Sequence, residues 1–181
     1  MRSCRDLALT LVAAAALLGG ASARGEDTMS FKLASDAFLE GQPIPKDHTC
    51  DGADRSPDLH WEGAPPGTQA FALIVDDPDA PVGNWNHWLL YNVPAGARAL
   101  ARGMPADPTL GDESRQGTND FGRIGYGGPC PPHGSNHRYY FKLYALSAPL
   151  DLQPGAKRDA VLKALGGKTL AEAELMGRYG R

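Results

Sequence analysis

Acidic and imidazole side chains gather at the end of one strongly apolar stretch of this chain. The run AFALIV at 70–75 is followed directly by DDPDAP, so that Asp77 and Asp79 lie in a turn that prolines rigidify. A few residues later, Trp85 and His87 open the next apolar run. Carboxylates and imidazoles can transfer protons, hold a metal ion or hydrogen-bond an anion. Aspartates that only cap turns and aromatic residues that only pack would give the same pattern, so these residues alone leave the chemistry open.

A second polar set follows a loop rich in glycine and proline. Residues 117–134 carry six glycines and three prolines around aromatic residues. This composition predicts a shaped loop, because glycine permits positive φ and proline fixes φ. The loop leads into His137 and Tyr139, where residues 139–146 alternate with the period of two that is typical of a β-strand. Polar groups at the mouth of a rigid strand often form binding sites.

Most of the secondary structure predicted around these acidic and imidazole residues is β-strand. The run at 70–75 is apolar throughout, as in a strand buried on both faces, and we expect it at the centre of the core. Residues 30–39, 59–61 and 87–93 predict further strands. Residues 98–115 show no clear periodicity and predict a long surface connection.

Two helices are predicted after the last long strand. Residues 157–165 place apolar residues on one face and stop at a glycine pair. A capping box at 169–172, with apolar residues recurring every four residues up to Tyr179, predicts the second helix. Strands first and short helices last predict a β-rich α+β domain, not alternating βαβ units.

The N-terminal residues differ in kind from the rest of the chain. Arg2 and Arg5 precede an apolar run at 7–18, and small residues follow it. This pattern is typical of a secretory signal peptide, and the run is too short for a comfortable membrane span. We therefore expect a signal peptide at 1–23, no membrane span, and one domain at 24–181 that is exported to the periplasm or secreted. A buried N-terminal helix is the alternative interpretation.

Cys50 and Cys130 are the two cysteines outside the predicted signal peptide. Export to an oxidising compartment favours a disulfide between them. Two buried free thiols are the alternative, because sequence does not show whether the Cα atoms come within reach. The formal net charge of −3 and the sequence pI of about 5.9 argue against electrostatic capture of nucleic acid.

Four motifs in a fixed order carry a resemblance to a known family. DPDAP, WNHW, GYGGPCPP and HRYYFKLYAL together resemble the phosphatidylethanolamine-binding protein family, in its bacterial branch of Raf kinase inhibitor-like proteins. The resemblance runs from about residue 31 to residue 179. It implies a large central antiparallel sheet, a second smaller sheet and short C-terminal helices.

The resemblance also implies a pocket for a small anion, phosphate or a phospholipid head group. By motif, its residues are Asp77, Asp79, Pro81, Trp85, His87, Gly128, Pro129, His137 and Tyr139. Histidine, tyrosine and glycine-loop N–H groups would donate to the anion. The carboxylates would hold an imidazole in its charged form or face the ammonium of a zwitterionic head group. Asn86 stands where many eukaryotic relatives have a second histidine.

Other functions stay open beside ligand binding. Relatives are described as inhibitors of kinases or proteases, and of these protease inhibition suits an exported chain better. A weak phosphoester hydrolase would use His87 as base and His137 or Tyr139 as acid, although no GxSxG or P-loop motif is present. The Asp and His set could also hold a metal ion. We expect a binding protein more than an enzyme, with no metal and no cofactor, and leave a homodimer open.

Overall fold

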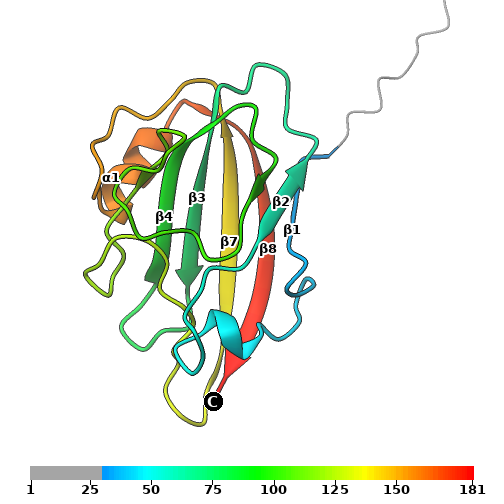
Figure 1. The fold of residues 1–181 in the computed structure, drawn as a ribbon, viewed down its shortest axis with the longest axis vertical. Coiled ribbons are helices and arrows are strands. Elements are labelled where there is room, and N and C mark those ends of the chain that lie inside the picture. The colour runs from blue at the N-terminus through cyan, green and yellow to red at the C-terminus, as the bar shows by residue number, and fades with distance from the viewer. Residues whose placement is uncertain (1–29) are drawn as a thin grey trace, which may run out of the picture.

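A three-stranded and a five-stranded antiparallel sheet dominate the computed structural model, which describes residues 30–181 (Figure 1). The predicted signal peptide at 1–23 lies outside the described residues. Within 30–181, no helix is long and apolar enough to cross a membrane. The predicted fold class, a β-rich α+β protein with a large and a smaller antiparallel sheet, is confirmed.

The order of the elements along the chain is mostly strands, with one α-helix close to the C-terminal end. They are β1 Lys32–Ala34, the 3-10 helix η1 Lys46–His48, β2 Leu59–Glu62, β3 Ala70–Asp77, β4 Trp85–Pro94, β5 Ala99–Leu100, β6 Arg115–Gln116, β7 Asn136–Leu146, α1 Arg158–Leu165 and β8 Thr169–Gly180. The predicted connection at 98–115 thus contains β5 and reaches the start of β6, with no regular strand or helix between them.

The large sheet has the strand order β6-β4-β3-β7-β8, which places β3 at its centre. All eight residues of β3 are buried, because the sheet is covered on both faces at this strand. The prediction that 70–75 lies at the centre of the core is therefore confirmed. Both neighbours of β3 run antiparallel to it, so the end of β3 lies beside the starts of β4 and β7.

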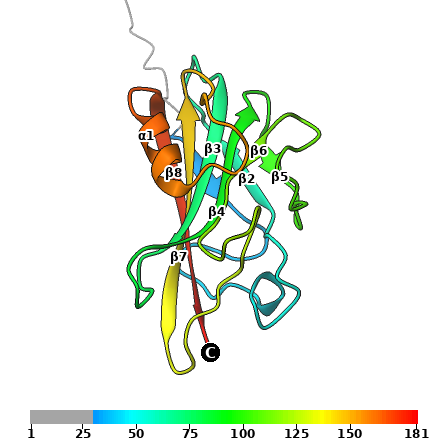
Figure 2. The same ribbon diagram turned by 90° about the vertical axis from the view of Figure 1, so that its left-hand side faces the viewer.

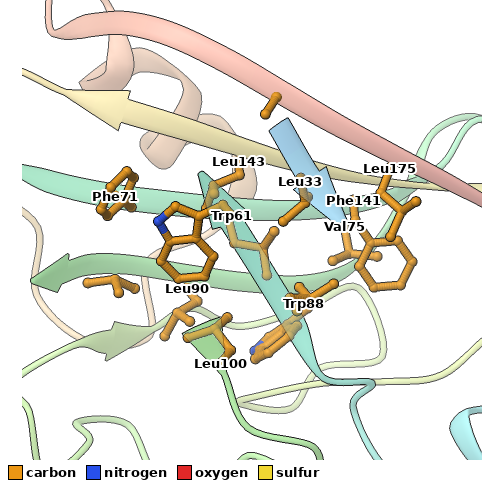
Figure 3. Packing of buried hydrophobic residues seen from close by; sticks show 14 of the residues in the cluster. Leu33, Trp61, Phe71, Val75, Trp88, Leu90, Leu100, Phe141, Leu143 and Leu175 are labelled. Atoms are coloured by element: carbon orange, nitrogen blue, oxygen red, sulfur yellow. The ribbon is translucent and has the colours of Figure 1, made fainter. Parts of the chain in front are cut away.

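Two apolar layers hold the sheets and the helix together. Figure 2 shows α1 and the small sheet on opposite sides of the large sheet. Alternate residues of β3 serve the two layers: Phe71, Leu73 and Val75 pack toward the small sheet, and Ala72 and Ile74 pack toward α1. Figure 3 shows the larger layer, in which side chains of both sheets interlock. Burial of each large apolar side chain stabilises the fold by roughly 1.5–3 kcal/mol.

The prediction of a second helix after residue 168 is wrong. Residues 169–180 form β8, which pairs with β7 from Asn136 to Leu146. Apolar residues spaced by four also fit a period of two, since four is a multiple of two. In the structure Ala173 and Leu175 are buried, and Glu174 between them is exposed. The long partner strand β7 therefore decides the conformation over the local helical signal.

Candidate functional site

A small cavity of about 220 Å³ lies where β3 ends and β4 and β7 begin. It is lined by Asp77, Ala80, Pro81, Val82, Trp85, His87, Phe121, Cys130, Pro131, Pro132 and His137. Five of the nine predicted site residues are in this lining: Asp77, Pro81, Trp85, His87 and His137. The antiparallel pairing of β3 with both neighbours brings these distant segments together.

The adjacent carboxylates at the end of β3 point to opposite faces of the sheet, as successive strand residues do. Asp77 lines the cavity. Asp76 forms a bidentate ion pair with Arg158 of α1, with nitrogen–oxygen distances of 2.8 and 3.0 Å. Its carboxylate also accepts a hydrogen bond from the side-chain amide of Asn86. Asp76 therefore anchors the helix to the sheet, and only Asp77 of this pair is available to the cavity.

Each oxygen of the Asp77 carboxylate accepts one hydrogen bond from a neighbouring donor. Its Oδ2 lies 2.7 Å from His137 Nδ1, and its Oδ1 accepts the backbone N–H of Asp79 at 2.8 Å. Asp77 and His137 are only 4% and 6% exposed. Because an ionised carboxylate can only accept, His137 carries its proton on Nδ1 in this contact. When the imidazole is also protonated on Nε2, the two side chains form an ion pair.

The second imidazole of the cavity is held by the glycine-rich loop. His87 Nδ1 donates to the backbone carbonyl of Gly127 at 2.6 Å. The ring also packs edge to face against Phe121 and Tyr139, each with a centroid distance of 5.2 Å. Burial lowers the pKa of His87 from its usual value near 6.5. At neutral pH His87 is therefore uncharged, and its Nε2 is a lone-pair acceptor.

The free atoms of the two imidazoles are their Nε2 atoms. Both Nδ1 atoms are used, by the Gly127 carbonyl and by Asp77. Neither Nε2 has a hydrogen-bond partner among residues 30–181, and both rings line the cavity. The cavity thus offers one acceptor, on His87, and one site on His137 that accepts or, when protonated, donates.

Asp79, predicted as a site residue, is directed away from the cavity. Its carboxylate binds the guanidinium of Arg138 through two bonds, of 2.6 and 2.8 Å, and accepts the backbone N–H of the same residue. The hydrogen bonds from the Arg138 side chain lower the pKa of Asp79 to about 2. The negative charge of Asp79 is therefore neutralised by Arg138 at the edge of the site. Asp79 contacts Asp77 through its backbone N–H and not through its carboxylate.

The glycine loop contributes to the site in a different way from that predicted. The Gly128 N–H donates to Asp54 Oδ1 at 2.6 Å, so it is occupied by the protein itself. The Pro129 carbonyl accepts the Cys50 N–H at 3.1 Å. A side chain at position 128 would collide with the His48 carbonyl, so glycine is needed there for close packing.

Tyr139 lies beneath the cavity and does not line it. The residue is fully buried, and its hydroxyl has no hydrogen-bond partner among the described residues. Burial raises the pKa of Tyr139 above its usual value near 10. The neutral phenol therefore supports the His87 ring from below, through the edge-to-face contact described above.

Two apolar residues of the rim were not predicted as site residues. Phe121 packs against both Trp85 and His87, and Val82 is 77% exposed at the cavity mouth. Phe121 lies in the glycine-rich loop, for which the sequence predicts a defined shape but no particular site residue at this position. Val82 follows the DPDAP turn, and no pattern in the sequence distinguishes it from an ordinary loop residue.

A disulfide joins the cavity rim to the segment after η1. Cys50 and Cys130 are bonded, with their Cα atoms 5.4 Å apart, so the disulfide prediction agrees with the structure and the free-thiol alternative does not. Cys130 is itself part of the cavity lining. Together with the Cys50 N–H bond to Pro129, the disulfide fixes the loop that leads to His137.

A larger cavity, of about 620 Å³, lies beside the small sheet. Its charged lining mixes both signs, with Lys32 and Arg98 beside Glu62 and Glu174. It gathers no pair of buried imidazoles with free nitrogens. The smaller cavity is therefore the better candidate for specific ligand binding, despite its size.

The fold and the cavity define a class: a β-sheet protein with a small cavity at the end of its central strand, in which one carboxylate and two imidazoles lie among apolar residues. A sequence model described as phosphatidylethanolamine-binding protein matches residues 34–180, and the chain belongs to this family. The resemblance stated from the four motifs is thereby confirmed.

Individual relatives support the same assignment. A UPF0098 protein of Aquifex aeolicus is 50% identical over 149 residues, which cover 81% of this chain and 86% of the relative. A putative phosphatidylethanolamine-binding protein homologue of Chlamydia trachomatis has a similar structure, with a TM-score of 0.77 and 39% identity over 84% of this chain and 98% of its own. YbcL of Escherichia coli, described as a member of the mammalian family, gives a TM-score of 0.79 and 35% identity over 83% and 98%.

Proposed function

We propose that this protein binds a small phosphoryl ligand, either phosphate or the head group of a phospholipid, in the 220 Å³ cavity. The observation that carries the proposal is the pair of open Nε2 atoms on His87 and His137, each on a ring whose Nδ1 is fixed by the protein. Fixed rings lose little freedom on binding, which favours affinity in a small site.

The two imidazoles set a requirement on the ligand. Neutral His87 presents a lone pair, so the ligand must offer a donor to it. When His137 carries a proton on Nε2 as well, it presents an N–H to an acceptor oxygen. Monohydrogen phosphate offers both groups, and phosphoethanolamine offers a phosphoryl oxygen and an ammonium. Sulfate at neutral pH offers only acceptors and would leave the His87 lone pair unpaired.

The carboxylates nearby are compatible with an anion. Asp77 accepts from His137 Nδ1 and from the N–H of Asp79, and its charge is balanced when His137 carries both of its protons. Asp79 is balanced by Arg138. The local charge at the cavity is therefore close to neutral when His137 carries both of its protons, and net negative when it does not.

A ligand panel measured by isothermal titration calorimetry tests the proposal. We expect phosphate and glycerophosphoethanolamine to bind, and sulfate to bind at least about fivefold more weakly, because an unpaired buried acceptor costs about 1–3 kcal/mol. His137→Gln should weaken phosphate binding, whereas His133→Gln, a change at an exposed histidine four residues away, should not. Equal binding of sulfate and phosphate, or equal effects of the two variants, would overturn the proposal.

We also propose that the protein acts outside the cytoplasm, after removal of residues 1–23. The charged and apolar pattern of those residues supports this, as does a disulfide whose two cysteines are both exposed and therefore open to reductants. Intact-mass analysis of protein from the periplasmic fraction should give a chain that starts near Arg24. A chain that retains Met1 and stays in the cytoplasm would contradict export.

A further inference from the structure

We propose that Asp36, Asp58 and His60 form a binding site for a divalent transition-metal ion, with Zn²⁺ as the reference cation. Their ligand atoms, two carboxylate oxygens and one imidazole nitrogen, all lie within 4.8 Å of one another. None of the three lines the 220 Å³ cavity, so this site is separate from the phosphoryl site.

The register of the small sheet explains why these three residues meet. Strands β1 and β2 pair antiparallel, with Ala34 opposite His60. Asp36 lies two residues beyond the end of β1 and Asp58 immediately precedes β2, so both lie at the same end of this strand pair. The backbone N–H of Asp36 donates to Asp58 Oδ2 at 2.8 Å, which holds the two residues close together.

The surroundings leave room for an ion at His60. It occupies the central strand of the small sheet and is exposed. Its cross-strand neighbours are Ala34 on one side and Ala99 on the other, both with small side chains. The imidazole can therefore turn toward the carboxylates without displacing a larger group.

Lys32 and Arg98 line the 620 Å³ cavity together with His60, so positive side chains are present in the neighbourhood of this site. Within residues 30–181, neither Asp36 nor Asp58 forms an ion pair with a lysine or arginine. Two carboxylates held this close to each other repel, because the Coulomb energy of like charges is unfavourable at short distance. A divalent cation between the two carboxylates removes this repulsion, so that binding and folding stability are coupled.

The ligand set selects the class of metal. Two carboxylates and one imidazole suit Zn²⁺ and similar transition metals, which bind nitrogen and oxygen at about 2.0–2.2 Å. Ca²⁺ and Mg²⁺ prefer oxygen ligands alone, and gain nothing from His60. Three protein ligands leave the remaining coordination positions to water, as in open zinc sites.

Titration of chelator-treated protein with ZnCl₂ tests this site. We expect one equivalent of Zn²⁺ to bind in a titration followed by calorimetry, and Ca²⁺ to bind at least tenfold more weakly. His60→Gln and Asp58→Asn should each weaken Zn²⁺ binding by at least about tenfold, since even residues behind the ligands cost 10- to 100-fold. Asp58→Asn keeps an acceptor for the Asp36 N–H and so preserves the local backbone.

The control is His133→Gln, which removes an exposed histidine outside the site and should leave Zn²⁺ affinity unchanged. Zn²⁺ should also raise the melting temperature of the wild type and not that of Asp58→Asn. Zn²⁺ binding that survives in His60→Gln, or an equal loss in His133→Gln, would overturn the proposal.

Discussion

Replacing Asp77 by Asn separates the role of its charge from the role of its shape. The carboxylate receives two hydrogen bonds, from His137 Nδ1 at 2.7 Å and from the Asp79 N–H at 2.8 Å. An Asn side chain has one acceptor oxygen, which can keep the Asp79 N–H. Its NH₂ group would then face His137 Nδ1, so the imidazole must accept there and move its proton to Nε2.

The expected result is weaker phosphate binding with the cavity shape preserved. In Asp77→Asn the donor of the bond from His137 to phosphate is uncharged and only the phosphate stays ionised, so part of the roughly 1.5–3 kcal/mol typical of a charged hydrogen bond is lost. A difference of about 1–2 kcal/mol corresponds to a loss of roughly 5- to 30-fold in affinity. Calorimetry at low ionic strength measures this loss, because salt screens the charge least there.

Asp79→Asn is the matched control, since it makes the same chemical change two residues along. The Asp79 carboxylate faces the partly exposed Arg138 and lies outside the cavity lining. We expect phosphate affinity to change by less than about twofold, with a small loss of stability, because partly exposed ion pairs contribute little. Equal losses in both variants, or unchanged affinity in Asp77→Asn, would refute the assigned geometry.

Three further predictions concern stability. Because burial lowers the pKa of His87, the unfolded chain takes up its proton first as the pH falls below about 6.5. The free energy of unfolding should therefore decrease as the pH falls from about 6.5 toward the lower pKa of His87 in the folded protein. In urea titrations at several pH values, this decrease should be shallower for His87→Gln than for the wild type. The same pH dependence in both proteins would contradict this. Arg158→Met leaves the buried Asp76 carboxylate without its cation and should cost about 2 kcal/mol in urea unfolding, and a neutral effect would mean that α1 does not depend on this pair. Reduction of the Cys50–Cys130 disulfide, which closes a loop with a sequence separation of 80, should cost up to about 4 kcal/mol in the chain-entropy account, and denaturation curves that coincide with and without reductant would argue against it.

The strands that position the cavity could be predicted because their sequence signals agree with their tertiary environment. The apolar run at 70–75 is a strand buried on both faces, and 139–146 is the alternating strand beside it. The meeting of Asp77 with His137 follows once the two strands pair antiparallel. Strand β8 could not be predicted from local pattern, since its spacing fits a helix as well as a strand and its partner β7 decides.

The detailed lining of the cavity depends on loop geometry that sequence does not encode locally. Asp77 and Asp79 are two residues apart and would share a face in a continuing strand, but β3 ends at Asp77 and the turn redirects Asp79 to Arg138. In the same way, the N–H of Gly128 points to Asp54, which is 74 residues away in the chain. Sequence can therefore indicate which segments form the site more readily than which atoms face the ligand.

The central claim is that a phosphoryl ligand contacts the Nε2 atoms of two specific imidazoles. The chain has five histidines, so ¹⁵N spectra of the imidazole nitrogens resolve a small and complete set. On titration with phosphate, we expect the Nε2 signals of His87 and His137 to shift, with the signals of His48, His60 and His133 unchanged. No shift at His87 and His137, or shifts of similar size at all five, would contradict the account.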